Sequence, residues 1–506
     1  MDAVTKSQPH DEAAITDVDV LVVGAGISGL SAAWHLKERL PHKRFLVLER
    51  EAHFGGTWLT HKFPGIRSDS DLYTFGFHFK PWVGPPIATA AEIQAYLGDM
   101  IEENHLDQHI RYNHSIETAA WDSATARWTL TARLPDGSRR QYRASFLWMA
   151  QGYYRHHQGH WPAYPGMDQF KGEIVHTEEW DEATDYTDKK VILIGSGATA
   201  ATVVPAMAQK AAHTTMIQRS PTYFMPGRNV NELAEMLRPI GVDEATIHDI
   251  VRKKIIYDQD QIVRQCRDAP EAVAAELLAG VQALLPDGFD MRHFTPSYRP
   301  WRQRLAFVPD GDLFAGIRAG KADVVTGTIA RFTPDGVEME DGTAVPADLI
   351  VLATGFNLCV FGDIDFSVDG RPLDLADTVT WRGMMFTGVP NLVWVFGYFR
   401  ASWTLRSDMI SEFTCRLLMH MENKGLDRVD VVLPAELEGA PRGPWADPED
   451  FNPNYLTRDQ HLLPKTAPGP EWRHTQDYWR EKDEIPRVNL DGPAFRYAKA
   501  KTPAAA

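Results

Sequence analysis

Two glycine-rich turns constrain the fold of this chain more than any other feature. Residues 24–29 (GAGISG) follow a continuous apolar run at 18–23, and residues 195–200 (GSGATA) follow a similar run at 191–194. An apolar run without alternation is typical of a strand that is buried on both faces of a parallel sheet. A helical pattern follows each turn. The sequence therefore predicts two strand–turn–helix units of a doubly wound α/β fold.

The first turn has the composition of a dinucleotide-binding loop. Gly24 permits the tight turn, Gly26 lets the backbone approach a pyrophosphate, and Gly29 lets the helix pack closely on the strand. The helix N-terminus offers free N–H groups to the phosphates. Glu49 ends the next predicted strand, 45–48, where a carboxylate can bind both ribose hydroxyls. A glycine pattern alone also occurs in ordinary turns, but the strand, the helix and the acid together favour FAD.

The second turn is similar, but different residues end the strand that follows it. That strand is predicted at 214–217, and Arg219 and Ser220 stand where the first unit has an acid. Arginine and serine can bind a 2′-phosphate, which an acid would repel, so NADPH is favoured; a solvated arginine is the alternative. Two such sites predict hydride transfer from nicotinamide to flavin. The turn is predicted to bind the NADPH pyrophosphate through Gly195, Gly197, Ala198 and Thr199.

Composition narrows the class of protein further. Lys and Arg total 52 and Asp and Glu total 68, and the resulting net charge of −16 argues against nucleic acid as a partner. Three cysteines without a CxxC pair exclude a redox dithiol, show no metal-ligand spacing and favour a reducing compartment. The N-terminus has no apolar signal core, and the apolar stretch 383–399 is too short to span a membrane. We expect a cytoplasmic protein without a transmembrane segment, for which an oligomer is possible.

The order of these patterns predicts the domain organisation of the 506 residues. Buried strands at 145–149 and 348–352 end in small residues, at 150–152 and 353–355, where we expect the chain to cross between two domains. Amphipathic helices occupy 230–285. We predict a disordered lead at 1–17, an FAD-binding domain at 18–150 and 356–445, an NADP-binding domain at 151–228 and 300–355, a helical subdomain inserted at 229–299, and a wrapping C-terminal tail at 446–506.

Several longer motifs resemble one enzyme family. Residues 170–181 (FKGEIVHTEEWD) match FxGxxxHxxxW(P/D), the fingerprint of type I Baeyer–Villiger monooxygenases. The order and spacing of motifs resemble that family from Val18 to about Met419. The ethionamide-activating branch is the most similar, on the strings GGTW at 55–58, PGIRSDSDLYTFGF at 64–77, PWRQRL at 300–305 and GVPNLVWVFGYFRASWTLR at 388–406.

The resemblance implies a fold, two cofactors and a reaction. The fold has two Rossmann-like domains, for FAD and NADP, with a helical insertion in the NADP domain. The reaction inserts one oxygen atom of O₂ next to a ketone carbonyl and gives an ester or lactone, with a flavin C4a-peroxide as the nucleophile. The GGTW string implies that Gly56, Thr57 and Trp58 also contact FAD.

The resemblance also implies the catalytic residues. A developing oxyanion needs a fixed cation that cannot lose its proton, and arginine meets that need. Arg304 aligns with the catalytic arginine of the family, and Asp69 aligns with its acidic partner at the flavin. Gln303 stands where the family usually has a lysine that contacts the 2′-phosphate, so the NADPH preference is expected to be weaker unless Arg302 compensates.

His176, inside the fingerprint, is grouped with the catalytic residues, but we expect it to order the linker between domains rather than transfer a proton. Trp180 is expected to anchor the same linker by packing. Residues 398–403 are expected near the flavin and the substrate.

Other functions stay open at this stage. A flavin-dependent oxygenase acting on the sulfur or nitrogen of thioethers, thioamides or amines would use the same two cofactors. A flavin disulfide reductase lacks its CxxC here, and a non-enzymatic flavin sensor would form no product. The substrate is therefore expected to be a ketone or a thioether, together with O₂.

Overall fold

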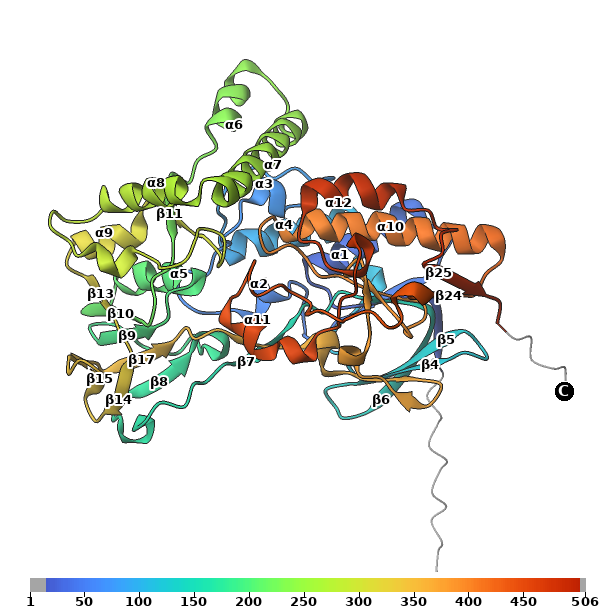
Figure 1. The fold of residues 1–506 in the computed structure, drawn as a ribbon, viewed down its shortest axis with the longest axis horizontal. Helices are drawn as coiled ribbons and strands as arrows, with labels where there is room; N and C mark the ends of the chain where they lie inside the picture. The colour runs from blue at the N-terminus through green and yellow to red at the C-terminus, as the bar shows by residue number, and fades with distance from the viewer. Residues whose placement is uncertain (1–14, 501–506) are drawn as a thin grey trace, which may run out of the picture.

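The structure is a computed structural model that describes residues 15–500. Two separate sheets lie toward opposite ends of the long axis, a nine-stranded mixed sheet and a five-stranded parallel sheet (Figure 1). This two-domain α/β architecture is the predicted fold class.

The parallel half of the nine-stranded sheet carries the first glycine turn. Its order is β23-β6-β1-β2-β3, and all its pairings are parallel. The four residues of β2 are buried, as predicted for a strand covered on both faces. The strands are β1 (Thr16–Val23), β2 (Phe45–Leu48), β3 (Ile110–Arg111), β6 (Arg139–Met149) and β23 (Leu392–Trp394).

Strand β1 begins earlier than the sequence predicted. Thr16 and Asp17, placed in the disordered lead by the sequence, pair with Tyr142 and Arg143 of β6. The Asp17 carboxylate accepts two hydrogen bonds from the Arg143 guanidinium, at 2.6 and 2.8 Å. This cross-strand ion pair stabilises the first residues of β1. Because those residues are polar, the apolar pattern of the sequence did not include them in the strand. Residues 1–14 of the predicted lead lie outside the described residues.

The other half of this sheet is mostly antiparallel and joins segments that are distant in sequence. β5 pairs with both β4 and β6, and β19 adds to the outer edge of β4. Strands β19 and β23 both follow residue 355, so the chain returns to this sheet after visiting the other one. The bounds are β4 (Ser115–Asp122), β5 (Arg127–Arg133), β19 (Asp365–Val368) and β20 (Arg371–Pro372).

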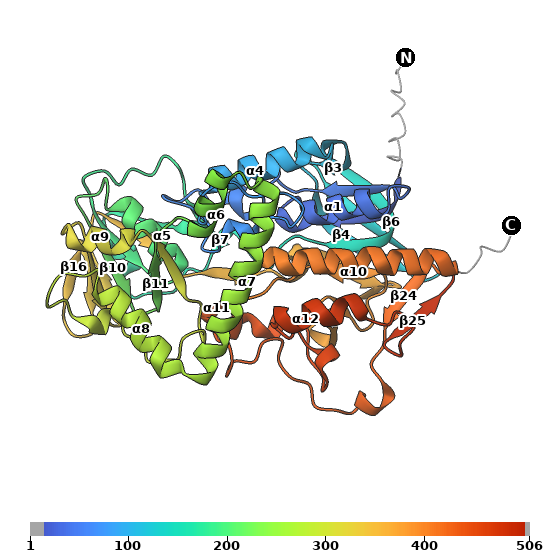
Figure 2. The ribbon, with the colours of Figure 1, turned by 90° about the horizontal axis from the view of Figure 1, so that it is seen from above.

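Two long helices lie side by side against this sheet, α1 (Ile27–Arg39) and α10 (Trp403–Lys424) (Figure 2). Gly26 is the N-cap of α1, so the helix starts inside the glycine turn. The other helices of this end include α2 (Thr57–Thr60), α3 (Leu72–Phe75), α4 (Ala90–Glu103) and α12 (Tyr478–Glu484).

The five-stranded sheet carries the second glycine turn, between β9 and α5. Its order is β13-β10-β9-β17-β8, and every pairing is parallel. The bounds are β8 (Glu173–His176), β9 (Lys190–Ile194), β10 (His213–Gln218), β13 (Ala322–Thr326), β17 (Leu349–Leu352), α5 (Ala198–Met207) and α9 (Asp312–Arg318). A small antiparallel sheet next to it contains β14 (Ile329–Thr333), β15 (Gly336–Met339) and β16 (Ala344–Pro346).

A helical segment connects β11 (Phe224–Gly227) to β12 (Ala306–Pro309), where the sequence places its helical insertion. Its longest helix, α7, lies below α6 in the upper part of Figure 1 and contacts α3 and the residue after it through Arg252. The Arg252 guanidinium donates to the backbone carbonyls of residues 73, 74 and 76. The helices are α6 (Glu232–Leu237), α7 (Glu244–Asp268) and α8 (Pro270–Gln282).

The connections between the two sheets pair with each other, and the tail packs back on the molecule. β7 (Tyr154–Gly159) pairs with β18 (Phe356–Leu358). In the tail, α11 (Asn454–Asp459) lies beside β18, and β25 (Phe495–Ala498) pairs with β24 (Arg428–Val431). Within residues 15–500, no helix combines the length and the apolarity that crossing a membrane requires.

Candidate active site

A cavity of about 1670 Å³ runs between the two glycine turns. Pockets for a single small molecule are typically about 300–1,000 Å³, so this cavity can hold more than one ligand. The predicted site residues line it, except Gly29 and His176. The lining residues among them are Gly24, Gly26, Glu49, Gly56, Thr57, Trp58, Asp69, Gly195, Gly197, Ala198, Thr199, Arg219, Ser220 and Arg304.

The first turn fits a dinucleotide because side chains are excluded from it. Gly24 has a φ of +99°, and a Cβ atom there would lie 2.8 Å from the carbonyl oxygen of Ala150. A Cβ on Gly29 would lie 1.8 Å from the carbonyl oxygen of Gly24, so Gly29 holds α1 against the strand end without facing the cavity. The side-chain amide of Gln151, in the cavity wall, is buried without a hydrogen-bond partner. The backbone cradle and this free amide are both suited to a polar ligand.

Glu49 is held in place at the carboxyl end of β2. Its Oε2 accepts a hydrogen bond from the backbone N–H of Ala25 at 2.6 Å, and its Oε1 accepts one from Glu51 at 2.8 Å. Burial raises the pKa of Glu49, and these two backbone hydrogen bonds oppose the rise. The carboxylate is therefore oriented beside the turn, as a ribose-binding acid requires.

The second turn repeats this geometry with different polar groups. Gly195 has a φ of +143°, and a Cβ there would lie 2.4 Å from the carbonyl oxygen of Ala353, whereas a Cβ on Gly197 would meet no atom within 4 Å. Arg219 is exposed in the cavity wall and forms no ion pair with the described residues. A free guanidinium here is available to a phosphate.

The GGTW string forms the start of α2 beside the first turn. Gly56 is its N-cap, with a φ of +57°, and Thr57 begins the helix. The Thr57 hydroxyl lies 2.6 Å from the hydroxyl of Tyr154 on β7, which ties α2 to the connection between the sheets. Trp58 is half-buried and packs edge-on against Phe75.

Arg304 and Asp69 form an ion pair in the cavity wall. The Arg304 Nε lies 2.6 Å from one carboxylate oxygen, and its Nη2 lies 2.9 Å from the other. Nη2 also donates to the Ser70 hydroxyl at 3.1 Å. Burial lowers the pKa of Arg304, but the charge of the Asp69 carboxylate opposes burial, and the net pKa is raised. The guanidinium therefore stays charged while 41% of its side chain is open to the cavity.

The two residues before Arg304 differ in orientation. Gln303 lines the cavity, but Arg302 does not, and its guanidinium lies 3.4 Å from Glu449 of the tail. The suggestion that Arg302 replaces the missing lysine therefore fails, because its charge is directed toward the tail. Arg219, in contrast, lines the cavity beside the second glycine turn.

His176 lies behind the cavity rather than in its wall. Its side chain is 1% exposed, its Nδ1 accepts from the backbone N–H of Glu178, and its Nε2 lies 3.3 Å from the hydroxyl of Thr354. Burial lowers its pKa. His176 therefore does not line the cavity with the other predicted catalytic residues, and it contacts Thr354 in the 353–355 crossing. The linker role of His176 stays a prediction. Trp180 is also buried.

The structure adds residues that the sequence did not single out. Tyr153 stacks on Trp403 with ring centroids 5.2 Å apart, and Tyr455 of the tail packs against Phe356 at 4.4 Å. All four line the cavity. The aromatic cluster at 398–403 was expected near the site, and Tyr398, Ala401 and Trp403 do line it. Tyr455 had no recognisable sequence signal, because the tail matches no motif.

Comparisons with known proteins agree with this geometry. Residues 22–82 match the family model of the NAD(P)-binding Rossmann-like domain, and residues 78–233 match the flavin-binding monooxygenase-like model. The chain is 44% identical to the FAD-containing monooxygenase EthA of Mycolicibacterium smegmatis, over 95% of this chain and 97% of that protein. It is 38% identical to the probable FAD-binding monooxygenase AlmA of an Acinetobacter species, over 95% and 96%.

Solved structures share the fold at low sequence identity. A steroid monooxygenase bound to NADP superposes with a TM-score of 0.74 at 21% identity, covering 96% of this chain and all of that one. An open structure of cyclohexanone monooxygenase gives 0.72 at 20%, with the same coverage.

The fold and the cavity define a flavin-dependent monooxygenase with two dinucleotide sites. The chain belongs to the family of FAD-containing monooxygenases that includes EthA, AlmA and MymA. This confirms the predicted resemblance and fold class, and the predicted cofactors FAD and NADP are those of this family and its structural neighbours.

Proposed function

We propose that this protein is a Baeyer–Villiger monooxygenase that uses FAD, NADPH and O₂ to convert a ketone into an ester or lactone. The observation that carries the proposal is the Arg304–Asp69 ion pair, which presents a fixed guanidinium to a cavity bounded by two dinucleotide turns. The three cysteines are free and buried, which suits the reducing cytoplasm in which we place the enzyme.

We assign FAD to the nine-stranded sheet and NADPH to the five-stranded sheet. Gly24, Gly26 and the α1 N-terminus would hold the FAD pyrophosphate, Glu49 its ribose, and the 56–58 segment its flavin side. Gly195, Gly197 and the α5 N-terminus would hold the NADPH pyrophosphate, with Arg219 at the 2′-phosphate. When bound, the FAD reduced by NADPH supplies the activation of O₂.

Arg304 supplies the electrostatic part of the reaction. Its raised pKa keeps the charge fixed, so the guanidinium can stabilise negative charge that develops on the oxygen of an attacked carbonyl. Asp69 orients the guanidinium through both of its oxygens and is a positioning residue as well as a charge partner. The rings of Tyr153, Trp403 and Tyr455 limit water around it.

A thioether is the alternative substrate, because the aromatic rings of the cavity wall can also pack against an apolar sulfur compound. In the test, purified enzyme is incubated with NADPH and, separately, with linear, cyclic and aryl ketones and one thioether, and the products are identified. Esters from at least one ketone, with NADPH consumption coupled to product, are expected. Sulfoxide without ester would overturn the Baeyer–Villiger assignment and leave an S-oxygenase.

Replacing the guanidinium tests the role of Arg304. We expect Arg304→Ala to retain FAD and to lose about 100- to 1,000-fold in ester formation, the usual cost of one preorganised electrostatic contact. NADPH consumption should continue and release hydrogen peroxide. Arg302→Ala is the matched control, because Arg302 lies one residue from the cavity wall, and it should keep its ester yield. Coupled ester formation by Arg304→Ala would show that another group stabilises the oxyanion.

A further inference from the structure

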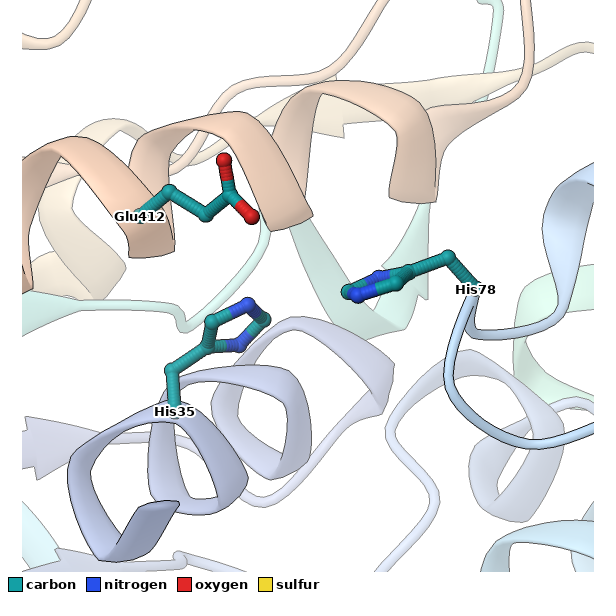
Figure 3. A group of neighbouring side chains, drawn as sticks. All are labelled: His35, His78 and Glu412. Carbon is teal, nitrogen blue, oxygen red and sulfur yellow. The ribbon is translucent and has the colours of Figure 1, made fainter. Parts of the chain in front are cut away.

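Three potential metal ligands meet outside the cavity, at the side of the nine-stranded sheet covered by α1 and α10. They are His35 of α1, His78 of the loop after α3, and Glu412 of α10 (Figure 3). One ligand atom of each lies within 4.8 Å of those of the other two. None of the three lines the cavity between the glycine turns.

His35 offers a buried nitrogen without a partner. Its side chain has no exposed surface, and its Nδ1 lies 2.8 Å from the backbone carbonyl of Ser31. A carbonyl can only accept, so Nδ1 carries the proton and Nε2 carries a lone pair. That Nε2 is buried and has no hydrogen-bond partner.

His78 is oriented in the same way by a carboxylate. Its Nδ1 lies 2.9 Å from Oδ2 of Asp408, and the other Asp408 oxygen accepts from the Ser31 hydroxyl at 2.9 Å. The Nε2 of His78 makes no hydrogen bond to the part of the chain that the structure describes. Metal-binding histidines usually donate their second ring nitrogen to a carboxylate or a backbone carbonyl, and the two histidines here show one of each.

Glu412 completes the group with a carboxylate near the surface. One of its oxygens accepts from Arg39 at 2.8 Å, and the other is left for a ligand role. The Glu412 side chain is 42% exposed and that of His78 is 40% exposed, so both can move. The Arg39 charge opposes a cation and limits the affinity of the site.

We propose that His35, His78 and Glu412 bind a zinc ion, with water as a fourth ligand. Two imidazole nitrogens and one carboxylate oxygen form a ligand set that Zn²⁺ favours. Zinc–ligand distances of about 2.0–2.2 Å place ligand atoms about 3.4 Å apart. The ligand atoms here lie within 4.8 Å of one another, so the exposed side chains must close by up to about 1.4 Å. The ion would join α1, α10 and the 76–79 loop, and it has no part in the oxygenation proposed above.

The first test is zinc binding by full-length holoenzyme, with its tag removed and treated with a chelator. Calorimetric titration with zinc chloride should show one ion per chain, and zinc should raise the thermal unfolding midpoint. Glu412→Gln should weaken binding at least about 10-fold, and Asp408→Asn should weaken it about 10- to 100-fold by releasing His78. Glu422→Gln, an exposed glutamate on the same helix, is the matched control and should bind like the wild type.

His35 is buried, so the variant His35→Gln can fail to fold for reasons unrelated to zinc. Its zinc affinity is therefore compared with that of Glu412→Gln, whose side chain lies near the surface. FAD content, measured for each variant, should stay at the wild-type value if only the metal site is changed. Equal zinc affinity in the wild type, Glu412→Gln and Asp408→Asn, or no stoichiometric binding at all, would overturn the proposal.

Discussion

At the scale of single residues, the two nucleotide sites differ by the charge at one equivalent position. Glu49 follows β2 in the first unit and Arg219 follows β10 in the second, and both line the cavity. A carboxylate favours ribose hydroxyls and an unpaired guanidinium favours a 2′-phosphate, and this difference is the reason we assign FAD to the first site and NADPH to the second.

The Arg219→Ala variant should lose selectivity for NADPH. One charge-assisted contact contributes about 1.5–3 kcal/mol, so the Michaelis constant for NADPH should rise about 10- to 100-fold while that for NADH changes little. Steady-state kinetics with both cofactors measures this. Equal effects on NADPH and NADH would show that Arg219 does not contact the 2′-phosphate.

At the scale of elements, the packing of each strand–turn–helix unit depends on how closely its helix approaches the glycine turn. In the first unit Gly29 touches the Gly24 carbonyl, and in the second the equivalent residue is Ala200, which is buried with its own Cβ. The two turns are therefore similar in sequence, but only the second has room for a methyl group at the position equivalent to Gly29.

Gly29→Ala should displace the start of α1, because the new Cβ would lie 1.8 Å from the Gly24 carbonyl oxygen. We expect loss of most bound FAD and a lower yield of folded protein, measured by the flavin-to-protein absorbance ratio. Ala200→Gly is the matched control. It should cost only about 0.5–1 kcal/mol, the usual price of glycine in a helix, and retain FAD. Full FAD content in Gly29→Ala would mean that α1 can shift without harm.

At the scale of the whole molecule, buried polar groups hold the C-terminal tail against the domain that contains the nine-stranded sheet. Glu481 of α12 pairs with Arg406 of α10 at 3.0 Å, and both side chains are fully buried. Glu481 also accepts a hydrogen bond from Tyr398 at 2.5 Å. Nearby, His474 of the tail stacks on Trp445 with centroids 5.2 Å apart.

His474 should make stability fall in mild acid. Burial, and then the charge of Arg406, hold the pKa of His474 well below its usual value, so the folded state keeps it neutral. The unfolded chain binds a proton below about pH 6.5, so the stabilisation is complete above that pH and is lost as pH falls. Between pH 7.5 and 5.5 the wild type should lose about 1.4 kcal/mol more unfolding free energy than His474→Gln. Parallel pH profiles of the two proteins would contradict this assignment.

The sequence by itself determined the parts of this protein that depend on neighbouring residues. The glycine turns at 24–29 and 195–200 and the buried strand at 45–48 were predictable because backbone torsion, Cβ contacts and continuous burial act over a few positions. Family motifs added Arg304 and Asp69, which the structure does bring into contact.

Only the tertiary structure decided which distant side chains meet. It turned Arg302 toward the tail, placed His176 behind the cavity wall, and brought Tyr455 beside the site. It also gathered His35, His78 and Glu412 from three separate segments. Such contacts depend on how whole elements pack on one another, and no local pattern in the chain records that packing.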